Sequence, residues 1–273
     1  MATKSARRGA SARTKTIPIR VITEADLRFA LEQGLDDFLT MRGDILLAGV
    51  IYTLIGVAAV VMTTNKPLLP YFFPVVAGVG LMGPIAAVGF YELARRRENG
   101  HRSNWMHFFD VVKRPSADDM SVVAGLLLLI FLGWLLAAGA LYGLLFGFWT
   151  PTSIGGFLTA VFTTAKGWGL IILGAAVGAA FGWLVLTVSV ASLPLMVDCD
   201  VSASEAVSTS WRAANANRAI MFRWGLIVTG LLILGSAPLF VGLAFVLPWL
   251  GYSTWHLYTR LVDRDAIPGR RYD

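Results

Sequence analysis

Long apolar runs dominate this chain of 273 residues and constrain its fold more than any other feature. Most of them have about 18 to 30 residues, long enough for α-helices to cross a hydrocarbon core about 30 Å thick. The alternating segments of about ten residues that a transmembrane β-barrel needs are absent. The sequence therefore predicts an all-α, polytopic membrane protein with six transmembrane helices. The predicted spans are residues 45–62, 69–93, 122–149, 168–197, 220–234 and 239–261.

The connections between the runs indicate how the spans pair. Turns built from Gly, Pro, Asn and Ser types close the first pair at residues 64–67 and the last pair at residues 235–238. Three hairpins place both termini on one side. Because residues 220–252 are almost unbroken apolar sequence apart from Arg223, the alternative is one very long span, five crossings and an external C-terminus. The basic C-terminal tail argues against this alternative, since basic tails stay in the cytoplasm.

Charge is distributed unequally between the two sides of this arrangement. All 17 acidic residues, and all 23 Lys and Arg except Lys66 and Lys166, fall on the side of the termini. Both termini are therefore expected in the cytoplasm, with the protein in a bacterial inner membrane. We expect a disordered basic tail at residues 1–20, a membrane domain at 21–262 and a cytoplasmic tail at 263–273. The basic tail either tethers the protein to anionic lipid or is solvated and only sets orientation.

Amphipathic segments precede three of the spans. The first opens at Thr23 with a capping-box-like start, and the third opens at Ser202 with the same spacing between a hydroxyl and an acid. Segments this short cannot span a membrane, and their aromatic faces suit the headgroup boundary. We predict cytoplasmic interfacial helices, each followed by a hairpin. A threefold internal repeat is one explanation; the other is that loops between membrane helices are commonly amphipathic. The candidate contacts to lipid or a partner are Phe38, Trp105, Phe109, Trp211, Trp255 and His256.

Two further features concern the outer half of the bilayer. Glycines recur every four residues and form small-residue grooves, which either seal the third span against the fourth or receive an oligomeric partner. These candidate packing residues are Gly139, Gly143, Gly147, Gly174, Gly178 and Gly182. Residues 150–167 show helical spacing but are too short to cross, so we expect a helix that lies on the outer leaflet or dips into it.

Residues that carry chemistry are scarce, and none lies near the predicted midplane, where transporters and proton relays place ionisable groups. His256 is either a haem or metal ligand or a hydrogen-bonded interfacial histidine, and the lack of a second suitably spaced histidine favours the latter. Cys199 lies between two acids, which disfavour a reactive thiolate. Asp118 and Asp119 begin a span, which favours helix capping over magnesium binding. We expect no cofactor, no metal and no catalytic residues.

Residues 194–210, which contain a Pro, Asp, Ser, Glu-Ala and Ser pattern, resemble the bacterial integral membrane family catalogued as domain of unknown function 2189. Residues 23–44, which include Leu35-Asp36-Asp37-Phe38, carry the same resemblance, and it extends from about Val21 to Val262. The resemblance implies a six-span inner-membrane protein. It supplies no agreed activity and no catalytic residues.

These observations leave two main classes of function. The first is a non-enzymatic scaffold or accessory subunit that binds lipid or a larger membrane complex, a respiratory one included, and the lack of midplane charge favours it. The alternative is a carrier or channel-like protein for an apolar or lipid-like substrate. We expect membrane lipids and a membrane complex as partners, and no nucleic acid; the sequence leaves the oligomeric state open. An enzyme acting on lipid would depend on Asp36, Asp37, His107, Asp198 and Asp200.

Overall fold

The computed structural model is helical throughout the part of the chain that it describes, apart from connecting loops and one isolated β-bridge. The described residues are 16–40, 58, 61–62, 66–101, 104–147, 149–238 and 240–267. Most of the first predicted span, residues 45–62, therefore lies outside the description. The helices are α1 (Glu24–Thr40), η1 (Lys66–Tyr71), α3 (Phe72–Leu81), α4 (Gly83–Glu98), η2 (Trp105–Lys113), α5 (Ala117–Phe146), α6 (Ile154–Thr163), α7 (Ala165–Ser189), α8 (Ser192–Asp198), α9 (Ala203–Ala216), α10 (Arg218–Ser236), α11 (Leu243–Leu261) and η3 (Arg264–Ala266).

Four helical segments in this described part are long and apolar enough to cross a membrane: Pro67–Glu98, Ala117–Phe146, Ala165–Asp198 and Arg218–Ser236. The predicted all-helical, multi-pass architecture is confirmed to this extent. Six spans, their arrangement in hairpins and the threefold repeat are not confirmed. The last predicted span forms α11, which is not among the four segments because polar residues interrupt its second half. The repeat also lacks a regular middle unit, since η2 is a short 3-10 helix whereas α1 and α9 are α-helices.

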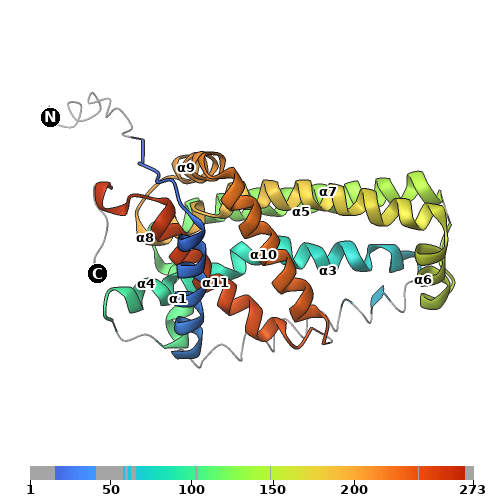
Figure 1. Cartoon of the computed structure of the whole chain (residues 1–273), viewed down its shortest axis with the longest axis horizontal. Coiled ribbons are helices and arrows are strands. Elements are labelled where there is room, and N and C mark those ends of the chain that lie inside the picture. Colours follow the sequence, from blue (N-terminus) through green and yellow to red (C-terminus); the bar gives the residue numbers. More distant parts are fainter. Residues whose placement is uncertain are drawn as a thin grey trace, which may run out of the picture.

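Figure 1 shows the long helices α5 and α7 side by side, with α3 running along them and α6 closing one end. At the other end α1, α8, α9, η2, η3 and the adjoining ends of α4 and α11 gather into a compact group, which we call the collar. The largest fully buried side chains belong mainly to this group, with Trp255, Tyr91, Tyr252 and Tyr258 at its centre. In the most apolar 18-residue window of each of the four segments, by contrast, only 17% to 24% of the residues are buried. Most of the surface of these windows is therefore available to lipid or to other membrane proteins.

Helix α1 crosses the bundle within the collar and packs along α11 (Figure 1). Its buried positions, Leu27, Ala30, Gly34 and Asp37, recur at helical spacing. The sequence analysis predicted that the apolar face of this segment lies at the headgroup boundary. The face packs against the protein's own helix, so it is not free to contact the bilayer.

Helix α1 approaches the backbone of α11 closely at Gly34, and this contact predicts a sensitive position. A Cβ atom on residue 34 would lie 2.5 Å from the amide nitrogen of Ser253 and 2.7 Å from its Cα. Because this backbone cannot rotate away, Gly34→Ala should lower the free energy of unfolding in mixed micelles by about 1–3 kcal/mol. The matched control is Gly182→Ala, because a Cβ atom on residue 182 would have no described heavy atom within 4 Å. Equal stability of the two variants would contradict the predicted contact.

The segment before α1 is anchored to the collar as well. Ile19 forms an antiparallel bridge with Val262, and the amide of Arg20 donates to the carbonyl of Leu261 at 2.8 Å. The buried Asn217 receives the amide of Ile22 on its Oδ1 at 2.8 Å and donates its Nδ2 to the Arg20 carbonyl at 3.0 Å. Residues 16–20, which the sequence analysis placed in the disordered tail, therefore pack against the C-terminal end of α11.

Candidate functional site: the ion-paired collar

A buried carboxylate on α4 organises one half of the collar. Glu92 is 1% exposed and accepts hydrogen bonds from Arg95, at 3.2 Å, and from Arg96, at 2.9 Å. Positions three and four residues later share a helix face with Glu92, so α4 supplies its own partners. A third arginine, Arg114, approaches from beyond η2, and its guanidinium lies 2.6 Å from Glu92. Glu92 thus joins the end of α4 to the start of α5.

The segment between η2 and α5 connects this cluster to α8 and α9. Arg114 also donates to the carbonyl of Val197 at 2.8 Å, and the hydroxyl of Ser116 donates to the Met196 carbonyl at 2.9 Å. Asp119 accepts the backbone amide of Ala203 at 2.8 Å. The carboxylate therefore caps the start of a different helix, α9, rather than the start of its own helix α5.

A second buried cluster centres on Arg264 in η3. Its guanidinium bonds to Glu98 at 2.7 Å and to Asp198 at 2.8 Å. Tyr258 donates its hydroxyl to Asp198 at 3.0 Å, and the indole of Trp255 donates to Glu98 at 3.1 Å. Burial opposes the charged form of the guanidinium, but the hydrogen bonds from Arg264 to Glu98 and Asp198 outweigh it and raise the pKa of Arg264. This residue holds α4, α8 and the chain after α11 together.

The predicted His256 belongs to a third group, between α1, α4 and α11. Its Nε2 lies 2.8 Å from a carboxylate oxygen of the buried Asp37, and its ring meets Phe29 edge to face. Arg97 reaches from α4 to both Asp37 and Asp36. His256 therefore has a hydrogen-bonded, partly buried position within the helix packing.

The helix is interrupted between α7 and α8, and a side chain of α9 bonds to the backbone groups at the interruption. Pro194 has no amide to donate to the Val190 carbonyl, so the regular helical ladder cannot continue there. From α9, the buried Ser210 hydroxyl donates to the Thr187 carbonyl at 2.9 Å and accepts the Ala191 amide at 3.1 Å. The break is thus supported by hydrogen bonds at the place where the long helix enters the collar.

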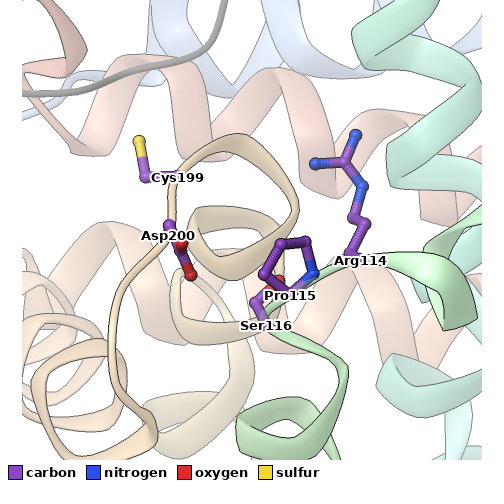
Figure 2. A pocket seen from close by; sticks show the side chains of 5 residues that line it. All are labelled: Arg114, Pro115, Ser116, Cys199 and Asp200. Atoms are coloured by element: carbon purple, nitrogen blue, oxygen red, sulfur yellow. The ribbon is translucent and has the colours of Figure 1, made fainter.

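The residues proposed for a lipid-acting enzyme do not converge. Asp36 pairs with Arg97, Asp198 pairs with Arg264, and His107 bonds to the backbone of Asn104 at the start of η2. Figure 2 shows the recess next to Asp200, lined by Arg114, Pro115, Ser116, Cys199 and Asp200. In it the thiol of Cys199 and the guanidinium of Arg114 lie on opposite sides, and the Asp200 carboxylate points away from both. Among the described residues, no group of three His, Cys, Asp or Glu could hold a metal ion.

The predicted aromatic contacts are divided between the core and the surface. Trp255 is fully buried, and Phe38 packs edge to face against Phe245 with ring centroids 4.7 Å apart. Trp211 and Phe109 are 49% and 60% exposed and face outward. The side chain of the remaining candidate, Trp105, is outside the description.

The 3-10 geometry of η2 creates an exposed stripe that the sequence analysis missed. With about three residues per turn, Met106, Phe109 and Val112 align on one face. These side chains are 64%, 60% and 72% exposed. Phe108 points the other way and packs edge to face on Phe90. The salt bridge between Asp110 and Arg96, at 3.0 Å, joins η2 to α4, and the salt bridge between Asp110 and Lys113, at 2.9 Å, lies within η2.

The six candidate glycines lie in α5 and α7 or at the end of α5. The three that have a described neighbour within 4 Å of a Cβ position face large side chains. A Cβ on Gly178 would lie 3.4 Å from the Trp134 ring, and one on Gly174 would lie 3.9 Å from Leu141. Gly139 lies beneath the Tyr71 side chain of η1. The remaining three have no described heavy atom within 4 Å of a Cβ position: Gly143, Gly147 and Gly182.

Comparison with known proteins gives one match. The model of a family described as a predicted integral membrane protein, domain of unknown function 2189, matches residues 72–198. This stretch runs from α3 to the end of α8 and includes Glu92, Arg114 and Asp198. The resemblance inferred from the sequence is confirmed over this range; α1 and everything after residue 198 lie outside the match. The comparisons with curated proteins and with solved structures find no match to the chain.

Proposed function

We propose that this integral membrane protein is a non-enzymatic inner-membrane scaffold or accessory subunit, with both termini in the cytoplasm, whose collar docks on a protein of a larger membrane complex. The observation that carries the proposal is the contrast between the interior of the collar and its edge. Inside, the charged side chains bind one another and join helices. At the edge, the η2 stripe of Met106, Phe109 and Val112 is exposed on a 3-10 helix that the salt bridge between Asp110 and Arg96 joins to α4.

Two physical arguments support a protein partner for this stripe. Contiguous apolar side chains at a protein surface mark interaction sites, and methionine and aromatic residues are enriched in protein interfaces. A rigid support also reduces the conformational entropy that binding would otherwise cost. The largely exposed faces of the four apolar segments would place such a subunit among lipids and neighbouring membrane helices.

A photo-crosslinking amino acid at position 109 tests this function in intact membranes. We expect one discrete protein adduct. The partner identified in this adduct should co-purify in mild detergent with the unmodified protein, but not with a Phe109→Glu variant of unchanged thermal stability. The matched control places the crosslinker at Glu32, an exposed position on α1. Adducts with lipid alone, or a protein that purifies without a partner and is indifferent to Phe109→Glu, would overturn the proposal.

A further inference from the structure

The hairpin of α10 and α11 does not extend as far along the molecule as the other long helices. Figure 1 shows α10 inclined to α5 and α7, and the α10–α11 turn lies well short of the end occupied by α6. Helix α10 has 19 residues and is therefore about 28 Å long, so an inclined α10 covers less than the thickness of a hydrocarbon core of about 30 Å. The turn accordingly lies at an intermediate depth, between the collar and α6.

The residues near α6 are of the kind that mark a membrane boundary, whereas those of the hairpin turn are not. Trp149 and Trp168 are 40% and 52% exposed, and Lys166 precedes Trp168 by two residues. Tryptophan and lysine are typical of the membrane–water interface. Residues 225–248, which include the whole turn, contain no charged residue, no Trp and no Tyr.

The surface of the hairpin near its turn is apolar. Ile233, Leu234 and Val241 are 65%, 68% and 59% exposed. An aqueous loop would instead carry polar residues at such positions. Contact of these side chains with water would be unfavourable because their apolar surface would be hydrated, whereas contact with acyl chains avoids this cost.

Three described amides of the turn find partners locally, as a segment in lipid requires. The amides of Ala237, Phe240 and Val241 donate to carbonyls within the turn or the last turn of α10, each at 3.0 Å. The hydroxyl of Ser236 donates to the Leu232 carbonyl at 2.7 Å, and Pro238 has no amide to satisfy. Backbone groups without a partner are costly in hydrocarbon, so this pattern suits a turn buried in the bilayer.

We propose that α10 and α11 form a re-entrant hairpin that enters from the collar side and ends inside the bilayer, where its turn contacts lipid acyl chains. The hairpin then adds no crossing to the topology, and the C-terminus stays on the same side as the start of α10. The depth of the turn, its lack of charge and its exposed apolar side chains are all consistent with one environment, the hydrocarbon core of the bilayer.

Cysteine accessibility in a Cys199→Ser background tests this inference. With a membrane-impermeant maleimide, Lys166→Cys should react from one face of the membrane and Lys113→Cys from the opposite face. From either face, the labelling rate of Ala237→Cys should be at least tenfold lower than that of the two controls. After denaturation in SDS, Ala237→Cys should react fully. A fluorophore attached at position 237 should also be quenched by phospholipids brominated in mid-chain, whereas one at position 166 should not.

The two measurements decide between a re-entrant hairpin and two complete spans. Reaction of Ala237→Cys from the same face as Lys166→Cys, at a comparable rate, would show that the turn emerges into water and would overturn the inference. Absence of quenching by brominated lipid would also overturn it, because the turn would then be covered by protein.

Discussion

Replacing Arg264 by alanine should lower the free energy of unfolding by about 3–5 kcal/mol, because it removes the buried cation that the buried Asp198 shares with the partly exposed Glu98. Its guanidinium bonds to both Glu98 and Asp198, and Asp198 is 1% exposed. In the variant, the buried Asp198 loses its hydrogen bonds from the guanidinium. Unfolding in mixed SDS and dodecyl maltoside micelles, followed by tryptophan fluorescence, measures the change.

Two further variants make this expectation specific. Arg20→Ala removes an exposed salt bridge to Asp263, so it should cost less than about 1 kcal/mol. Arg264→Ala combined with Asp198→Asn should recover part of the loss, since the second substitution removes the uncompensated charge. If Arg264→Ala were no more destabilising than Arg20→Ala, the second cluster would not hold the collar together.

The sequence predicted best those properties that depend on residues close together in the chain. Apolar runs and the spacing of polar residues are local, so the helical, multi-pass architecture and the amphipathic character of α1 and α9 followed from them. The start signals were also informative: the Ser202 side chain accepts the Glu205 amide at 3.4 Å at the N-terminus of α9. The number of spans depends instead on how helices are inclined and packed, which local hydropathy does not contain.

The η2 stripe shows the limit of reading a period from a short segment. The α-helical period would place Trp105, Phe108, Phe109 and Val112 on one face. In a segment of nine residues, the spacing of apolar residues hardly distinguishes a period of 3.0 residues from one of 3.6. The difference turns Phe108 inward, onto Phe90, and brings Met106 into line with Phe109. The exposed surface therefore had to come from the structure.

The buried ion pairs were beyond sequence reasoning for a different reason. Arg264 was counted only as a charge of the C-terminal tail, yet its partners Asp198 and Glu98 are 66 and 166 positions away. A carboxylate and an arginine that are distant in sequence carry no local sign that they meet. Glu92 was equally taken only as the end of a span, although Arg95 and Arg96 follow it at helical pairing distances.

Glu92→Ala should be the second strongly destabilising substitution, with an expected loss of about 3–5 kcal/mol of unfolding free energy. The carboxylate is 1% exposed and receives hydrogen bonds from Arg95, Arg96 and Arg114. Without it, the guanidinium groups repel one another, and Arg95 is itself only 5% exposed. Because Arg114 reaches both Glu92 and the Val197 carbonyl, the loss should also loosen the contact between the start of α5 and α8.

A graded set of variants separates the charge of Glu92 from its side-chain packing. Glu92→Gln retains the size and one hydrogen-bond acceptor, so it should lose less stability than alanine. Asp36→Ala, which removes a carboxylate with 64% side-chain exposure from its salt bridge with Arg97, should cost less than about 1 kcal/mol. If the alanine variant of Glu92 accumulates too poorly to purify, Glu92→Gln provides the measurement, and its loss should still exceed that of Asp36→Ala. Equal losses at positions 92 and 36 would mean that the arginines are stabilised by water or by other partners, and that the charge of Glu92 does not organise the collar.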